Sequence, residues 1–489
     1  MTAITWRRDI AASLVVFLVA LPLCAGVAVA SGVPAELGLI TGIVGGLVAG
    51  LLPGSSLQVS GPAAGMTVLV FEAVHRYGVA ALGTLVLAAG LIQLLLGALR
   101  MGRWFRAISV AVVEGMLAGI GLTIIAGQLY AMAGVTAPGS GPAKLAGLPA
   151  LLTDALATPA AAASLGLGAA TIAVLVLWPR LPARVRAVPG PLAAVALATA
   201  AVPVLDLPVD RLQVQGLLNA VQPPGLDDLA PLTELAGLGT IAAFALIASA
   251  ESLFSAAAVD RMHDGPRTDY DKELMAQGAG NTVCGALGAL PMTAVIVRSA
   301  TNVQAGARTK AARVLHGVWL LLFAALLPAA LGLIPLAALA GVLVHAGWKL
   351  LPTAQLRPLW RRHRGEAIIL ICTAVAVVAL NLFEGVLLGL LLAVLKTAWE
   401  TSHIHLEVTD DGDGPVHVAL TGNATFLRLP KMLDTLEALP RDRPIELDLA
   451  GLRHLDHACR TALTAWADRH NDAGTPAVSL PPDPVGAGT

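Results

Sequence analysis

The sequence reads QVSGPAAG at residues 58–65 and PMTAVIVRSA at residues 291–300. Both stretches interrupt apolar segments with glycine, proline or β-branched residues, which favour turns and extended backbone over helix. The apolar segments around them belong to runs that approach the roughly 20 residues a helix needs to cross a bilayer. The sequence therefore predicts two helices that are broken within a membrane, one in each half of the chain.

The composition is that of a membrane protein. Of the 489 residues, 56% are hydrophobic and only 13% are charged, whereas soluble domains carry about 25% charged residues. Residues 1–402 hold 43 charged residues, and the much shorter stretch 403–489 holds 20. We therefore predict a transmembrane domain at 1–402 and a small soluble domain at 403–489. The net charge of −1 argues against a nucleic-acid partner, and the four scattered cysteines suggest neither disulfides nor a metal site.

Apolar runs predict fourteen membrane segments, near 10–30, 35–52, 61–75, 79–99, 107–130, 160–178, 189–205, 235–258, 270–289, 299–307, 311–333, 335–351, 366–383 and 385–401. With the N-terminus inside, the cytoplasmic loops hold 18 Lys and Arg residues, against three outside (Arg76, Lys144 and Arg211). This asymmetry follows the positive-inside rule. We expect both termini in the cytoplasm and the first run to be a retained span, without a cleaved signal.

The acidic loop at 206–234 divides the segments into two groups of seven, repeat one at about 1–205 and repeat two at about 235–402. An odd-numbered unit and its copy insert in opposite orientations, so we predict an inverted repeat. The third segment of each half carries the interruption. Short segments broken at matching positions of two halves point to the binding site of a transporter.

The residues at the two breaks favour an anion. Ser60 is a candidate helix cap with Pro62 in the first turn, and Ser299 is a candidate start for the second helix. Two half-helices would then direct their N-termini at each other, and exposed N–H groups together with the helix dipoles attract negative charge.

Arg298 would add a further positive charge, while small Ala63 and Gly65 leave room for a solute. The plainer alternative is a pair of kinked helices in which Arg298 has a structural role.

Glu251 lies in the apolar run ALIASAESLF at residues 245–254. Acidic residues inside membrane segments often mark proton or ion pathways. We hypothesise that protonation of Glu251 leaves the positive field free for the substrate anion, which would couple anion uptake to protons. The alternatives are a sodium site that uses Glu251 with Ser249, Ser252 or Ser255, and a structural Glu251–Arg298 pair.

These residues resemble the SulP family of anion transporters, the sulfate permease or solute carrier 26-like group that includes prestin and pendrin. Asp9 and the stretch 20–65 match the family's first three segments, and a second block runs from Glu251 through Gly280-Asn281 to Arg298–Thr309. The resemblance implies a polytopic α-helical protein of fourteen segments in a 7+7 inverted repeat. Segments one to four and eight to eleven would form a core domain, and the others a gate domain.

The resemblance also implies where the substrate binds and how it moves. The site would lie between the N-termini of segments three and ten, and elevator-type movement of the core would expose it alternately. Glu251 maps onto the coupling position, and the substrate site maps onto Ser60, Gly61, Pro62, Ala63, Ala64, Arg298, Ser299 and Ala300. Some bacterial bicarbonate carriers have a hydroxyl residue in place of Ala63 and an aspartate in place of Glu251, which favours proton over sodium coupling here.

Residues 403–489 resemble the STAS domain that follows SulP membrane regions. We predict strands at 405–408, 416–420 and 445–449, and helices near 424–438 and 457–470. The run Asp456-His457-Ala458-Cys459 lacks the phosphorylatable serine of anti-sigma antagonists, so phospho-switching is not expected there. The run 481–489 is predicted to be disordered.

We interpret the chain as a bacterial inner-membrane secondary transporter of small anions, such as sulfate, bicarbonate or a dicarboxylate like fumarate, with proton symport. No HExxH, GxSxG or Walker loop is present, so neither an enzyme nor an ATP-driven pump is expected, and no cofactor is implied. The expected partners are the anion, a proton or sodium ion, the lipid bilayer and a second copy in a homodimer. Alternatives are a sodium-coupled bicarbonate symporter, a nucleobase–proton symporter of the same fold, an anion channel and a sensor driven by the C-terminal domain.

Overall fold

The structure, a computed structural model, describes residues 3–103, 109–138, 140–182, 184–214, 216–410, 412, 414–440, 443–472 and 478. The chain forms two compact units, Met1–Leu390 and Leu391–Thr489. The division falls inside helix α17 (Leu382–Thr401), whose end lies next to the predicted boundary at 402/403. The run 481–489, predicted to be disordered, lies outside the described residues.

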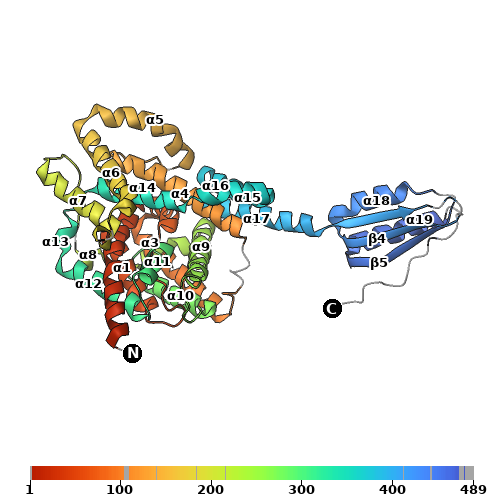
Figure 1. Cartoon of the computed structure of the whole chain (residues 1–489), viewed down its shortest axis with the longest axis horizontal. Helices are drawn as coiled ribbons and strands as arrows, with labels where there is room; N and C mark the ends of the chain where they lie inside the picture. Colours follow the sequence, from red (N-terminus) through yellow and green to blue (C-terminus); the bar gives the residue numbers. More distant parts are fainter. Residues whose placement is uncertain are drawn as a thin grey trace. The chain divides into compact units, whose positions relative to one another are not determined.

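The first unit is almost entirely helical (Figure 1). Its first half contains α1 (Ala3–Ala30), α2 (Ala35–Val44), η1 (Gly45–Ala49), β1 (Ser60–Pro62), η2 (Ala64–Met66), α3 (Thr67–Ala98), α4 (Val110–Met132), α5 (Gly141–Ala157), α6 (Pro159–Leu177), η4 (Trp178–Arg180), η5 (Val185–Ala187) and α7 (Gly190–Val204). The short elements α8 (Leu217–Ala220) and η6 (Leu226–Leu232) follow. The second half contains α9 (Leu235–Val259), α10 (Tyr270–Ala286), β2 (Met292–Ala294), α11 (Ile296–Gln304), α12 (Ala311–Leu326), α13 (Pro328–Leu331), α14 (Leu336–Leu350), α15 (Thr353–Arg362), α16 (Arg364–Ala379) and α17.

Helices occur at all fourteen predicted segments, but three of these segments do not form separate single helices. Most of the predicted segments 61–75 and 79–99 lies in one helix, α3, which is kinked where Gly78 adopts φ 83°. The predicted segment 311–333 ends earlier and divides into α12 and α13 at Leu327. Helix α5 was not predicted, because its proline and its modest hydrophobicity resemble a loop.

Six helices among the described residues are long and apolar enough to cross a membrane: Thr5–Ala30, Ala64–Ala98, Val110–Met132, Pro159–Arg180, Leu235–Val259 and Leu336–Arg362. Three shorter apolar helices are Ala35–Ala49, Gly190–Val204 and Ala311–Leu326. These helices agree with a polytopic membrane protein. The count of fourteen crossings stays a prediction, since broken and tilted segments do not reach the full length individually.

The two halves of the first unit interleave rather than pack as separate bodies. Helix α3 packs extensively against α10, α1 against α12, and α4 against both α14 and α16. Small residues allow the α3–α10 approach: a Cβ on Gly278 would stand 2.6 Å from the backbone nitrogen of Leu94. Small residues at helix contacts are typical of membrane proteins, where close backbone packing replaces the hydrophobic effect as the driving force.

A buried carboxylate fastens the start of α1 to the second half. The side chain of Asp9 is fully buried. Its Oδ1 accepts hydrogen bonds from the backbone N–H groups of Arg308 (2.7 Å) and Thr309 (3.2 Å), and its Oδ2 accepts one from the Thr309 hydroxyl (2.5 Å). The carboxylate thus accepts hydrogen bonds from the backbone N–H groups of the turn that precedes α12.

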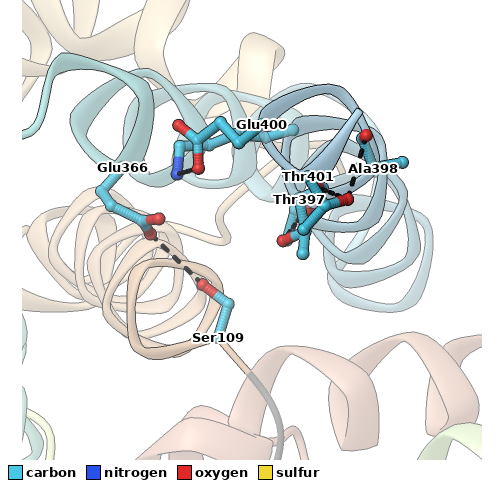
Figure 2. A network of polar contacts seen from close by, with 8 residues as sticks. Ser109, Glu366, Thr397, Ala398, Glu400 and Thr401 are labelled. Carbon is cyan, nitrogen blue, oxygen red and sulfur yellow. Dashed lines mark hydrogen bonds and ion pairs between the residues drawn. The ribbon is translucent and has the colours of Figure 1, made fainter. Parts of the chain in front are cut away.

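A weaker polar contact joins the ends of α4 and α16. The hydroxyl of Ser109, which precedes α4, donates to Oε2 of Glu366 in the first turn of α16 at 3.4 Å (Figure 2). The contact links two helices that belong to different predicted repeats.

The second unit is a small α/β domain with strands β3 (Ile404–Thr409), β4 (Val416–Ala424) and β5 (Ile445–Leu455) in the order β3-β4-β5. Strands β3 and β4 are antiparallel, and β4 and β5 are parallel. The parallel pair is connected through η7 (Phe426–Arg428) and α18 (Leu429–Glu437), and α19 (His457–Asp472) completes the domain. The predicted strands and helices are confirmed.

Within this unit, the last turn of α17 is tied to the sheet. The Thr401 hydroxyl donates to the carbonyl oxygens of Thr397 (2.8 Å) and Ala398 (3.2 Å) (Figure 2). The Thr401 carbonyl accepts from the amide of Asn423 at 2.8 Å, and the guanidinium of Arg428 lies 4.2 Å from the centre of the Trp399 ring.

We expect Asp9→Ala to lower the melting temperature of the purified protein by several degrees. Hydrogen bonds to a charged group contribute about 1.5–3 kcal/mol each, and the substitution removes three of them. Thermal unfolding in detergent measures the effect. Asp154→Ala, at an exposed position of α5, is the control and should leave the melting temperature unchanged; an equal drop in both variants would contradict the assignment.

We expect Asp456→Ala to destabilise α19 by about 1 kcal/mol, as loss of a helix N-cap does. Burial opposes its ionisation, but the N–H groups of Cys459 (2.8 Å) and Phe426 (2.5 Å) outweigh burial and lower the pKa of Asp456. A lowered folded-state pKa means that this stability is present above the unfolded pKa of about 3.9 and is lost as the pH falls through the folded-state pKa.

Hydrogen exchange of the α19 amides in the full-length protein measures this change. Asp468→Ala, exposed on the same helix, should leave exchange unchanged. Wild-type exchange rates in the Asp456→Ala protein at neutral pH would show that the carboxylate does not hold the helix.

Candidate functional site

The two broken segments meet as a short two-stranded sheet in the interior of the first unit. Strand β1 pairs antiparallel with β2 in the register Ser60↔Ala294, Gly61↔Thr293 and Pro62↔Met292, and all six residues are buried. The N–H of Val295 extends the ladder by donating to the carbonyl of Val59 at 2.9 Å. Each strand leads directly into a helix, β1 into η2 and α3, and β2 into α11.

Side chains from α9 and α10 satisfy the outer edge of β2. The amide of Asn281 accepts from the Met292 N–H (2.7 Å) and donates to the Met292 carbonyl (3.0 Å). The Ser252 hydroxyl accepts from the Ala294 N–H (3.1 Å), and the Ser255 hydroxyl donates to the Ala294 carbonyl (2.8 Å). These contacts matter because extended backbone inside a membrane has no water to satisfy its polar groups.

The segment that enters β1 is held in the same way. The amide of Asn302 donates to the Leu57 carbonyl (2.9 Å), and the Ser299 hydroxyl accepts from the Val59 N–H (2.9 Å). The Gln277 amide donates to the Ser60 hydroxyl (2.7 Å). Polar groups of the second half of the unit therefore hold the break in the first half.

The predicted helix caps are wrong in detail. Ser60 and Pro62 lie in β1 rather than at a helix start, and the turn that begins α3 follows Ala63. Ser299 lies in the first turn of α11, which begins at Ile296, and its hydroxyl donates to the Val295 carbonyl (2.8 Å). Pairing of the two strands provides hydrogen bonds to more backbone N–H and C=O groups than a single capping serine hydroxyl could. The segments therefore pair as strands where helix caps were predicted.

A cavity of about 160 Å³ lies beside the β1–β2 pair, which is large enough to hold several water molecules or a small anion. Both helix starts line it, through Ala64 and Gly65 on one side and Ile296–Arg298 on the other. The remaining walls are Val19, Leu23 and Val27 of α1, Val113, Met116 and Leu117 of α4, Leu175 of α6, Pro191 of α7, Glu251, Phe254 and Ser255 of α9, and residues of α14 from Val342 to Leu350.

Arg298 brings a buried positive charge to this cavity. The residue is 1% exposed. Its Nη2 donates to the Pro62 carbonyl at 3.0 Å, whereas Nε and Nη1 are buried without a hydrogen-bond partner. Gly61 is required beside it, because a Cβ at that position would overlap Nη1. Buried donors without partners are rare and costly, and a bound anion is a natural acceptor for them.

Glu251 lines the same cavity without neutralising Arg298. No ion pair joins these two side chains in the part of the chain that the structure describes. The carboxylate instead lies against the start of the α3 region, where a Cβ on Gly65 would overlap its Oε1. The Glu251 carboxyl and the Arg298 guanidinium thus line one cavity without pairing. A negatively charged ligand and a proton could therefore occupy different positions in it.

The predicted site residues divide into two groups. Pro62, Ala63, Ala64, Arg298 and Glu251 line the cavity.

Ser60, Gly61, Ser299 and Ala300 are not part of the lining. The hydroxyls of Ser60 and Ser299 are engaged with Gln277 and with the Val59 and Val295 backbone, so they position the strands.

Of the three serines considered as sodium ligands, Ser255 lines the cavity, and its hydroxyl donates to the Ala294 carbonyl. Sequence reasoning did not identify several other cavity residues. His345 and Lys349 lie one helical turn apart on α14 and add basic groups to the opposite wall. Thr293 carries a buried hydroxyl without a hydrogen-bond partner, which only the pairing of β1 with β2 brings here.

The proposed sodium ligands are largely committed elsewhere. The Ser249 hydroxyl donates to the Ala245 carbonyl (2.5 Å) and accepts from Gln93 (3.1 Å), and the Ser252 hydroxyl accepts from the Ala294 N–H. Among the described residues, no group of three or more His, Cys, Asp or Glu side chains could hold a metal ion. The cavity therefore combines a buried guanidinium that has free donors with a carboxylate that does not pair with it.

Related proteins are transporters of anions. The putative sulfate transporter YvdB of Bacillus subtilis is 29% identical over 412 residues, which cover 83% of this chain and 76% of that protein. The bicarbonate transporter BicA of Picosynechococcus sp. is 27% identical over 432 residues, covering 85% and 75% respectively.

Two solved structures share the fold. The transmembrane domain of a cyanobacterial bicarbonate transporter BicA has a TM-score of 0.68 at 24% identity, covering 81% of this chain and 98% of that one. The murine Solute Carrier 26 family member A9 anion transporter in the inward-facing state has a TM-score of 0.80 at 16% identity, covering 98% and 86%. The family model described as the sulfate permease family matches residues 6–373. The chain is therefore an anion transporter of the sulfate permease (SulP) family.

Proposed function

We propose that this protein is a secondary active transporter that carries a small oxyanion, sulfate, bicarbonate or a dicarboxylate such as fumarate, in symport with protons. The observation that carries the proposal is the buried guanidinium of Arg298, with two nitrogens that lack partners, at a cavity reached by two helix starts. Sulfate, bicarbonate and carboxylates all present oxygens that can accept from a guanidinium fork. The names of the related proteins support the first two substrates.

Proton coupling would depend on Glu251. A deprotonated carboxylate at the cavity opposes the entry of an anion, and protonation removes that repulsion. Binding of the anion and of the proton would therefore reinforce each other, as linkage requires. The engagement of the Ser249 and Ser252 hydroxyls in structural hydrogen bonds favours this mechanism over a sodium site.

The mechanism that we propose is elevator-type alternating access by a protein of fourteen segments in a 7+7 inverted repeat. The cavity walls support a division into core and gate. One side comes from α1, the β1–η2 region, α9 and α11, and the other from α4, α6, α7 and α14. These are the segments assigned to the core and the gate by the family resemblance. Movement between the two groups would change which side of the membrane the cavity faces.

We further propose a bacterial inner-membrane location with both termini cytoplasmic, a homodimer, and a STAS identity for residues 403–489. The excess of Lys and Arg in alternate loops supports the orientation. The β4–α18–β5 crossover and the mixed three-stranded sheet support the STAS assignment.

We expect Arg298→Gln to reduce anion uptake into proteoliposomes at least tenfold. The substitution removes the charged donor that the cavity holds for the anion, and a charged hydrogen bond contributes about 1.5–3 kcal/mol. Arg298→Lys keeps the charge but not the fork and should restore only part of the uptake. The measurement is uptake of radiolabelled sulfate, bicarbonate and C4-dicarboxylates.

Arg308→Gln is the matched control, because Arg308 is exposed and only its backbone contacts Asp9. Its uptake should equal that of the wild type. Normal uptake of every transported anion by Arg298→Gln would exclude this residue from the binding site.

We expect Glu251→Gln to abolish accumulation driven by an inward proton gradient while anion exchange survives. The amide cannot take up a proton, so the gradient no longer drives the cycle, whereas the anion site keeps Arg298. Uptake with and without the gradient, at matched internal and external salt, measures the effect.

Glu234→Gln provides the control, since this exposed carboxylate precedes the same helix. Accumulation that requires a sodium gradient instead of a proton gradient would disprove proton coupling and favour the sodium alternative.

A further inference from the structure

A second cavity, of about 200 Å³, lies further along the same helices. Its lining comes from the end of α1, from α3, from α4 and the segment that follows it, and from α5: Val29, Ala30, Thr67, Val68, Phe71, Thr123, Ile124, Gly127, Gln128, Ala131, Val135, Thr136, Ala137 and Lys144. No acidic side chain is among these residues. The cavity therefore has a basic and hydroxyl-rich lining on an apolar frame.

Lys144 supplies the charge. The residue is only 7% exposed, and its ammonium lies 5.3 Å from the centre of the Phe71 ring. The Tyr130 hydroxyl donates to the Lys144 carbonyl at 2.8 Å and fixes the backbone of the lysine. Glu72 attracts the ammonium from nearby, yet no carboxylate in the described ranges lies within ion-pair distance of it.

Further hydrogen-bond donors line the same cavity. The Thr67 hydroxyl is buried and has no hydrogen-bond partner. The side-chain amide of Gln128 and the hydroxyl of Thr136 also line the cavity. The Thr123 hydroxyl is already donated to the Gly119 carbonyl at 2.9 Å. A buried hydroxyl without a partner and a buried ammonium outside ion-pair distance thus line one cavity. The oxygens of an oxyanion could accept hydrogen bonds from both groups.

The two cavities follow one another along the same helices. Helix α1 contributes Val27 to the first cavity and Val29 to the second, and α4 contributes Leu117 and then Thr123. Along α4 and at the start of α3, the buried core residues Ile120 and Met66 separate the two sets of lining residues, and they are 0% and 1% exposed. The second cavity thus lies beyond these residues, at the end of α1 and α4 that the Lys and Arg distribution assigns to the outside.

We propose that this second cavity is an outer binding site for a small oxyanion, held by Lys144 together with Thr67, Gln128 and Thr136. The inference rests on the proposed function, because it assigns a stage on the transport path of the same class of substrate. Anion from outside would bind here first and reach the Arg298 cavity when the packing of Met66 and Ile120 opens. The site would raise the local anion concentration at the outer entrance without taking part in proton coupling.

Binding is tested without transport by following a thiol at the cavity. The reporter is Val135→Cys, at an exposed lining position that is not a proposed ligand. It is combined with Arg298→Gln, to remove the first site, and with Cys372→Ser; Cys24, Cys284 and Cys459 are buried. The full-length protein is reconstituted in phosphatidylcholine vesicles, so that no anionic headgroup competes. A membrane-impermeant maleimide labels the thiol from outside in sulfate or bicarbonate, and gluconate at equal ionic strength is the control.

We expect one of the two anions to slow labelling severalfold, and Lys144→Gln to eliminate that protection. Arg76→Gln removes an exposed cation on α3 outside the cavity and should keep the protection. Equal labelling rates in sulfate, bicarbonate and gluconate, or equal protection with and without Lys144, would overturn the site.

Transport kinetics provide the second test. With Arg298 intact, Lys144→Gln should raise the half-saturating concentration of external anion about tenfold, the usual loss of a charged hydrogen-bond partner, with an unchanged maximal rate. Thr67→Val, which conserves shape, should raise it a few fold, and Lys144→Arg should restore it.

Failure of this inference can be told from failure of the proposed function. If an anion protects the thiol of the cysteine variant, but the wild-type protein accumulates no anion in vesicles, the outer site is supported and the proposed transport function is overturned. Normal accumulation with an unchanged half-saturating concentration in both Lys144→Gln and Thr67→Val would overturn the site and leave transport intact.

Discussion

The backbone at the two breaks must find hydrogen-bond partners inside a low-dielectric interior, and much of the first unit is arranged to meet that requirement. Each unsatisfied N–H or C=O group in such an environment costs several kcal/mol. Strands β1 and β2 pair across three residue pairs. The side chains of Asn281, Ser252 and Asn302 form hydrogen bonds with backbone groups that this pairing leaves free. Because β1 pairs with β2 and Asn302 of α11 binds the segment that enters β1, the two halves of the unit must interleave to satisfy this backbone.

This solution to the backbone problem also creates the functional cavity. Pairing of the strands ends the two broken segments at one place, so that both helix starts face the same space. Gly61 and Gly65 allow the guanidinium of Arg298 and the carboxylate of Glu251 to approach the backbone, since a Cβ at either position would overlap them. The result is a positive and an acidic group that share a cavity without pairing, which suits coupled binding of an anion and a proton.

The sequence predicted much of the helical framework because membrane segments must be apolar over nearly their whole length. Helices occur at each predicted segment, and the breaks lie at 58–65 and 291–300 as the Gly, Pro and β-branched residues indicated. The roles of Ser60 and Ser299 were not predictable in the same way. A serine before a helix can cap it or brace a strand, and the choice depends on partners such as Gln277 that lie more than 200 residues away.

Composition, run lengths and the positions of the breaks thus determined, by themselves, a membrane protein with two interrupted segments and a buried Arg298 and Glu251. Only the tertiary structure decided which of these groups keep free hydrogen-bonding capacity. Arg298 retains two nitrogens and Thr67 a hydroxyl without hydrogen-bond partners. The hydroxyls of Ser249 and Ser252, by contrast, are hydrogen-bonded to backbone groups. The physical reason is that hydrogen-bond satisfaction is a property of a whole neighbourhood, to which residues far apart in the chain contribute.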